Sequence, residues 1–187
     1  RVEVVPFGVP AVARASSLPA AVREPYVLAV STDEPRKRHA HLVRAFAVLA
    51  SHAPDVSLVL AGGDAGATAD VLDAIASLRP EVRARVVRLG AVDDATRSAL
   101  LRRASVLAYP SADEGFGFPA LEAMSVGVPV VATRVGAVQE TAGDAALLVD
   151  VVDDVRPLVA ALETALSDEA TRSSLIRCAL WARIITR

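Results

Sequence analysis

Residues 106–132 read VLAYPSADEGFGFPALEAMSVGVPVVA, and the fold prediction starts from this stretch. An apolar run typical of a buried strand leads into a polar loop with two glycines, Gly115 and Gly117, and a second apolar run follows later. Pro119 favours a helix start after the loop, because a proline in the first turn loses no intrahelical hydrogen bond. The free N–H groups and the dipole at such a helix start favour an anion such as phosphate. The stretch therefore predicts one strand–loop–helix–strand unit with an anion site in its loop.

The rest of the chain alternates apolar runs with segments of helical periodicity. The predicted strands are residues 26–30, 56–61, 86–89, 105–109, 128–132 and 146–149. The predicted helices are residues 38–53 and 70–78, a helix capped by Asp93 or Asp94 that continues through Arg103, a short helix from residue 119, and two C-terminal helices that begin near residues 153 and 168. This alternation predicts an α/β fold with a doubly wound, parallel, six-stranded, Rossmann-like sheet. With the common strand order 3-2-1-4-5-6, a crevice opens between the carboxyl ends of the first and fourth strands.

Composition supports a single domain over residues 1–187. The chain has 187 residues, of which 53% are hydrophobic, and this is enough for one buried core. A net charge of -2 argues against a nucleic-acid partner. The single cysteine, Cys178, excludes an internal disulfide and fits a reducing compartment. No apolar run approaches the roughly 20 residues of a membrane-spanning helix, so no transmembrane segment is expected.

The loop that follows the first predicted strand carries the cations of the predicted crevice. Residues 31–38 read STDEPRKR, and this topology places Arg36 and Lys37 opposite the glycine loop. Lys37 is the only lysine in the sequence. An ammonium group acts as a point charge on a phosphate. We therefore expect these cations to face an anion such as phosphate, and Arg38 to face solvent at the start of the helix.

The glycine loop resembles the E-x7-E signature of family 4 retaining glycosyltransferases (group 1 glycosyltransferases), which use nucleotide-sugar donors. The matching residues are Pro110, Ser111, Glu114, Gly115, Phe116, Gly117, Pro119, Leu121, Glu122, Ala123, Met124, Gly127, Pro129 and Val130. In that family the signature lies in the C-terminal, donor-binding half of a GT-B fold. Residues 4–9, VVPFGV, are similar to the family's linker into this half. The resemblance implies that the N-terminal acceptor domain is absent from this chain.

The resemblance also implies roles for the signature residues. Glu114 is expected to bind hydroxyls of the donor sugar. The backbone N–H groups of Gly115, Phe116 and Gly117 are expected near the sugar and the phosphates. Glu122 is expected to accept hydrogen bonds from the ribose hydroxyls, which suits an acceptor-only carboxylate.

Further roles follow for the cations and the base. Lys37 matches the family's lysine, whereas residues 31 and 32 are Ser and Thr where the family has Gly and Arg, so Arg36 is the expected second cation. The nucleobase is expected near residues 90–92, including Val92. Leu121 of the signature is also expected to bind the nucleotide.

The chemistry that this resemblance implies is stabilisation of a leaving group. Cleavage of a sugar–phosphate bond builds negative charge on the nucleoside diphosphate, and fixed cations and N–H donors lower that barrier. Lys37, Arg36 and Glu114 are the expected catalytic residues, and Glu114 is not expected to be a nucleophile. The chain lacks the Asp-x-Asp triplet that commonly holds a metal in the other large glycosyltransferase fold. We expect neither a metal nor another cofactor.

Three alternative functions stay open. Gly115, Gly117 and Ala120 match the G-x-G-x-x-A pattern of a dinucleotide (NAD-type) domain. Five residues separate Tyr109 from Gly115, whereas the turn in a dinucleotide domain is tight, and Pro119 lies inside the pattern. Both observations weigh against that alternative. The others are a sugar-nucleotide epimerase, which shares the fold, and a non-catalytic nucleotide-sugar-binding module.

The expected enzyme moves a hexose from a nucleoside-diphosphate sugar to a glycan, lipid or small-molecule acceptor. The run E-P-R-K is similar to mannosyltransferase-like members, which favours GDP-mannose over UDP-sugars. The isolated chain is expected to be inactive or nearly so. A cytoplasmic location is expected, and peripheral contact with the inner face of a membrane through the missing domain stays open.

Overall fold

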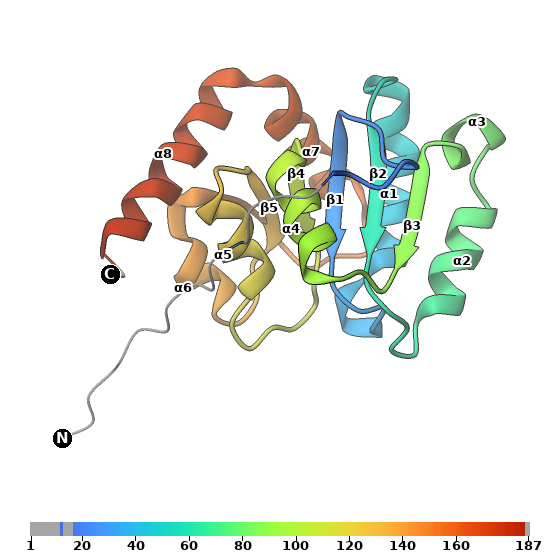
Figure 1. The fold of residues 1–187 in the computed structure, drawn as a ribbon, viewed down its shortest axis with the longest axis horizontal. Helices are drawn as coiled ribbons and strands as arrows, with labels where there is room; N and C mark the ends of the chain where they lie inside the picture. The colour runs from blue at the N-terminus through green and yellow to red at the C-terminus, as the bar shows by residue number, and fades with distance from the viewer. Residues whose placement is uncertain (1–11, 13–16, 186–187) are drawn as a thin grey trace.

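Six parallel strands form one sheet at the centre of the molecule (Figure 1). The computed structural model describes residue 12 and residues 17–185. The strands are β1 (Tyr26–Val30), β2 (Ser57–Ala61), β3 (Val86–Gly90), β4 (Val106–Tyr109), β5 (Val130–Thr133) and β6 (Ala146–Val149). Their order is β3-β2-β1-β4-β5-β6, which confirms the predicted doubly wound sheet. Residues 4–9, which are similar to the family's linker, lie outside the described residues.

Helices cover both faces of the sheet. They are α1 (His39–His52), α2 (Thr68–Ala76), α3 (Pro80–Arg83), α4 (Asp94–Arg103), α5 (Phe118–Ser125), α6 (Val138–Ala142), α7 (Arg156–Ser167) and α8 (Glu169–Ile185), with 3-10 turns η1 (Pro35–Lys37) and η2 (Gly143–Ala145). In the described part of the chain, no helix combines the length and the apolar character needed to cross a membrane.

The alternation of side chains along the buried strands creates two cores. Tyr26 and Leu28 of β1 point to the face covered by α4, α5, α6 and α8. Val27 and Ala29 point to the opposite face, which is covered by α1, α2, α3 and α7. Every residue of β1 is buried, because both faces of this central strand are covered. Continuous apolar runs therefore predicted the strands correctly.

Two short helices and the start of α1 differ from the sequence prediction. α3 and α6 were not predicted, because helices of four and five residues are too short to show a helical period. Arg38 does not face solvent as expected. It adopts a left-handed φ of 54°, and its Nη2 donates to Val152 O at 2.7 Å. The arginine thus ties the start of α1 to the loop before α7, and its side chain is only 15% exposed.

Candidate functional site

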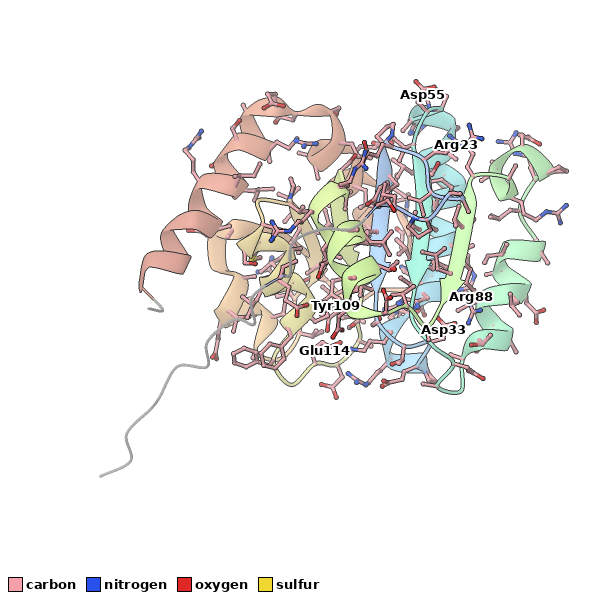
Figure 2. The ribbon with its side chains drawn as sticks, viewed as in Figure 1. Arg23, Asp33, Asp55, Arg88, Tyr109 and Glu114 are labelled. Carbon is pink, nitrogen blue, oxygen red and sulfur yellow. The ribbon has the colours of Figure 1, made fainter. Side chains whose placement is uncertain are left out.

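Two loops meet where the strand order reverses. β1 and β4 are parallel neighbours with Leu28 opposite Leu107, so their carboxyl ends share one edge of the sheet. The loop after β4 joins the loop after β1 through a 2.7 Å hydrogen bond from Ala112 N to Arg36 O. Figure 2 shows Glu114 at this edge of the sheet. The two loops lie together where the sequence predicts the crevice.

Lys37, in the loop after β1, contacts the glycine loop after β4. The 3-10 turn η1 ends at this residue and directs its side chain inward, leaving Lys37 only 6% exposed. Its Nζ forms an ion pair with Glu114 Oε1 and donates to Tyr109 Oη at 3.3 Å. The same nitrogen lies 5.2 Å from the centroid of the Tyr109 ring, within the range of a cation–π contact. The ammonium group is therefore held by a carboxylate, a hydroxyl and an aromatic ring.

Arg36 supplies a second positive charge to the same carboxylate. Its Nη1 lies 3.4 Å from Glu114 Oε2 and donates to Asp113 O at 3.0 Å. Its Nε donates to Glu34 Oε2 at 2.6 Å. The Arg36 side chain is 41% exposed, so part of the guanidinium group stays in contact with solvent. The structure thus brings together the three residues that the sequence predicts to be catalytic.

The protonation of Glu114 follows from these contacts. Burial alone would raise the pKa of the Glu114 carboxyl, but the hydrogen bond and the charge of Lys37 outweigh it, so the pKa lies below its ordinary value. Burial, together with the adjacent Glu114 carboxylate, raises the pKa of Tyr109. Near neutral pH the site therefore contains an ionised Glu114 and a neutral Tyr109.

Only one of the two predicted loop glycines is required by its surroundings. Gly117 has a φ of 79° at the start of α5, and a Cβ there would lie 2.8 Å from Val138 Cγ2. A Cβ at Gly115 would meet nothing within 4 Å. Gly136, which sequence reasoning missed, has a φ of 47°, and a Cβ there would lie 2.1 Å from Glu114 O. Gly136 therefore permits the close approach that holds the Glu114 backbone in place.

The apolar residues expected near the nucleotide lie around the start of α5 and after β3. Phe116 is half-buried, with its ring centroid 4.6 Å from that of Phe118. Phe118 is 38% exposed and was not predicted as a site residue. Leu121 and Val92 are partly buried and pack against the core that α4 and α5 share. These positions are compatible with their predicted roles, which stay predictions.

Glu122 is paired with a residue that sequence reasoning missed. It is 7% exposed on α5, and both of its carboxylate oxygens accept hydrogen bonds from Arg97 of α4. The Arg97 Nη1 bond to Oε1 measures 3.1 Å. No spacing rule links the two positions in the sequence. The signal that could have found this pair is that α4 and α5 pack on the same face of the sheet. Glu114 and Glu122 therefore have separate cationic partners.

Comparison with known proteins agrees with the fold and with the resemblance of the glycine loop. The model of the family described as "Glycosyl transferases group 1" matches residues 9–179, and the chain belongs to this family. O-antigen chain mannosyltransferase B of Escherichia coli is 36% identical over 147 residues, which are 79% of this chain and 38% of that protein. The chain thus spans less than two fifths of the length of this relative.

Two solved structures extend the comparison. Anabaena HepE, whose structure contains UDP and glucose, is 25% identical with a TM-score of 0.75 over 89% of this chain and 44% of that protein. The C-terminal domain of the group 1 glycosyl transferase LpcC from Francisella tularensis has a TM-score of 0.72 at 21% identity, over 87% of this chain and 85% of that one. The latter supports the fold alone, which is that of the C-terminal half of a GT-B glycosyltransferase.

Proposed function

We propose that this chain is the donor-binding domain of a retaining, metal-independent glycosyltransferase. The enzyme transfers a hexose from a nucleoside-diphosphate sugar to a glycan, lipid or small-molecule acceptor. An N-terminal domain, which binds the acceptor in this proposal, completes the active site. GDP-mannose and UDP-sugars are the candidate donors. The mannosyltransferase relative supports the first, and the UDP and glucose in the HepE structure support the second.

The observation that carries this proposal is the meeting of Lys37, Arg36 and Glu114 at the loop that leads into α5. The positive end of the helix and the two cations all favour an anion at this edge of the sheet. When the bond between the anomeric carbon and the phosphate oxygen breaks, its electron pair goes to the diphosphate. Because the cations are already in place, they stabilise this charge without reorganisation.

The two carboxylates take different parts of the donor in this proposal. Glu114 binds hydroxyls of the hexose while it holds Lys37, since an ionised carboxylate has about four acceptor sites. Glu122 binds the ribose hydroxyls. Leaving-group stabilisation by Lys37 and Arg36 needs no metal ion, and this supports the proposed metal independence.

Nucleotide binding without added metal tests the proposal. The thermal unfolding midpoint of the full chain is measured with UDP, GDP, ADP and NAD in the presence of a chelator, because a ligand that binds only the folded state raises it. We expect one nucleoside diphosphate to raise the midpoint of the wild type. Lys37→Met, which removes the ammonium group and keeps most of the stem, should lose this shift.

Arg79→Met is the matched control, because Arg79 is 68% exposed on the surface and pairs with Glu81. It should bind the nucleotide like the wild type. Stabilisation by NAD alone would instead support a dinucleotide domain. An equal rise of the unfolding midpoint with nucleotide in the wild type and in Lys37→Met would show that Lys37 does not bind the nucleotide.

A further inference from the structure

A second polar cluster is centred on Asp33, in the loop after β1. Asp33 Oδ1 accepts a hydrogen bond from His39 Nδ1 at 2.7 Å. Oδ2 accepts from Arg88 Nη2 at 2.6 Å and Nε at 3.1 Å, and from Thr68 Oγ1 at 3.0 Å. The other ring nitrogen, His39 Nε2, lies 2.8 Å from Ser31 Oγ. Figure 2 shows Asp33 and Arg88 near each other at the same sheet edge as Glu114.

The contacts of Asp33 determine which ring nitrogen of His39 carries the hydrogen. Burial would raise the pKa of Asp33, but hydrogen bonds from His39, Arg88 and Thr68 outweigh it and hold the pKa below its ordinary value. An ionised carboxylate only accepts hydrogen bonds, so Nδ1 of His39 must be the donor. The network thus assigns the Nδ1–H tautomer.

The remaining proton position follows for Ser31. Burial lowers the pKa of His39 in spite of the adjacent Asp33, and the charges of Lys37 and Arg88 act in the same direction as burial. The ring is therefore neutral near pH 7, and its Nε2 can only accept a hydrogen bond. The hydroxyl of Ser31 consequently donates its hydrogen to His39 and retains its lone pairs for another donor.

Packing holds the Ser31 backbone at the edge of the sheet. Ser31 N donates to Ala61 O at 3.1 Å, and a Cβ at Gly62 would lie 1.8 Å from Ser31 O. Asp33 and His39 are only 2% and 3% exposed, whereas Ser31 is half-buried. Of these three residues, Ser31 is the one that a ligand in the crevice can reach.

We propose that Ser31, oriented by His39 and Asp33, is a specificity residue that accepts a hydrogen bond from a hydroxyl group of the nucleotide-sugar donor. This inference rests on the proposed function. A phosphate oxygen also presents lone pairs, so it gains no hydrogen bond from a serine whose hydrogen is already committed. A hydroxyl of the hexose or of the ribose supplies the missing hydrogen. The cluster therefore favours hydroxyl groups over phosphate at this position.

Ligands that differ in their hydroxyl groups test the inference. Binding of UDP-glucose, GDP-mannose, UDP, GDP and pyrophosphate to the full chain is measured by calorimetry for the wild type and Ser31→Ala. We expect Ser31→Ala to weaken binding of the preferred sugar nucleotide about 2- to 10-fold, the worth of one neutral hydrogen bond, and to leave pyrophosphate unchanged. Ser51→Ala is the matched control, because this exposed serine of α1 bonds its own helix at Val48 O.

The pattern of losses identifies the hydroxyl. A loss confined to the sugar nucleotide assigns it to the hexose. A loss that extends to the nucleoside diphosphate, and disappears with its 2′-deoxy or 3′-deoxy analogue, assigns it to the ribose. An equal loss for pyrophosphate, or no loss for any ligand, would overturn the inference while the proposed function stands. Failure of the wild type to bind every nucleotide at millimolar concentration would overturn both.

The tautomer of His39 provides a test that needs no ligand. A long-range proton–nitrogen NMR spectrum near pH 7 should place the ring hydrogen of His39 on Nδ1. Ser31→Ala should leave this tautomer in place, because Asp33 sets it. A hydrogen on Nε2 in the wild type would mean that Ser31 accepts from His39 and is free to donate to phosphate, which would overturn the inference.

Discussion

Arg97 and Glu122 lie 25 positions apart in sequence and form an end-on pair between α4 and α5. Both terminal nitrogens of the guanidinium group donate to the carboxylate, one to each oxygen. This arrangement occupies one lone pair on each carboxylate oxygen, and two adjacent ribose hydroxyls that approach the carboxylate end-on would need the same lone pairs. In the proposed site, Arg97 and the nucleotide therefore compete for Glu122.

Removal of Arg97 should therefore tighten nucleotide binding. Arg97→Met leaves Glu122 buried without its cation, so the free energy of unfolding should fall by about 1–3 kcal/mol. The ribose hydroxyls then satisfy an otherwise unpaired carboxylate, and the Kd for the nucleoside diphosphate should decrease. Calorimetry and urea unfolding measure the two effects, with Arg79→Met as the surface control. Weaker binding by Arg97→Met would show that Arg97 positions Glu122 instead of competing for it.

The pairing of Lys37 with Glu114 should appear as a coupling energy. Breaking a buried ion pair costs about 3–5 kcal/mol of unfolding free energy, and Arg36, at 3.4 Å from Glu114, should keep Lys37→Met toward the lower end. Lys37→Met combined with Glu114→Gln should cost about 1–3 kcal/mol less than the sum of the single changes. Urea unfolding of the four proteins measures this difference. Additive costs would mean that the two charges do not stabilise each other.

A fall in pH should remove the contribution of Glu114 to the free energy of unfolding. Its folded-state pKa is lowered, so its stabilising contribution is fully present above the unfolded-state pKa of about 4.3 and disappears as the pH falls through the folded-state pKa. The urea midpoint of the wild type should therefore fall more steeply below about pH 4 than that of Glu114→Gln, which does not titrate. Parallel curves for the two proteins would contradict the lowered pKa.

A methyl group at Gly136 should disturb the site by displacing the backbone of Glu114. A Cβ there would lie 2.1 Å from Glu114 O at a φ of 47°. Gly143 has a similar φ of 48°, and its Cβ would meet nothing within 4 Å, so Gly143→Ala is a control that strains the backbone at positive φ without a clash. At φ 48° and ψ −132° an alanine is strained, so we expect Gly143→Ala to cost about 1–3 kcal/mol with unchanged nucleotide affinity. Gly136→Ala should lower the free energy of unfolding by more than Gly143→Ala and should also weaken nucleotide binding. Equal effects of the two changes on stability and on affinity would rule out a role for the close approach of Gly136 to Glu114.

Much of the fold could be predicted because burial leaves a pattern in the sequence. An apolar run such as β1 indicates a strand covered on both faces, and the parallel order then brings the loops after β1 and β4 together. Lys37 and Glu114 were accordingly expected at one edge, and they meet there. The roles of these residues in nucleotide binding stay predictions.

Hydrophobic periodicity and turn residues are local properties of the chain, so the sequence was enough to predict the six-stranded parallel sheet and the two loops that meet after β1 and β4. Which side chains meet depends on how the elements pack in three dimensions. Arg97 reaches Glu122, and Gly136 packs against Glu114, because helices and loops distant in sequence pack on one sheet. Periodicity reports which face of an element is buried, but it does not report the direction of a polar side chain or its partner on another element.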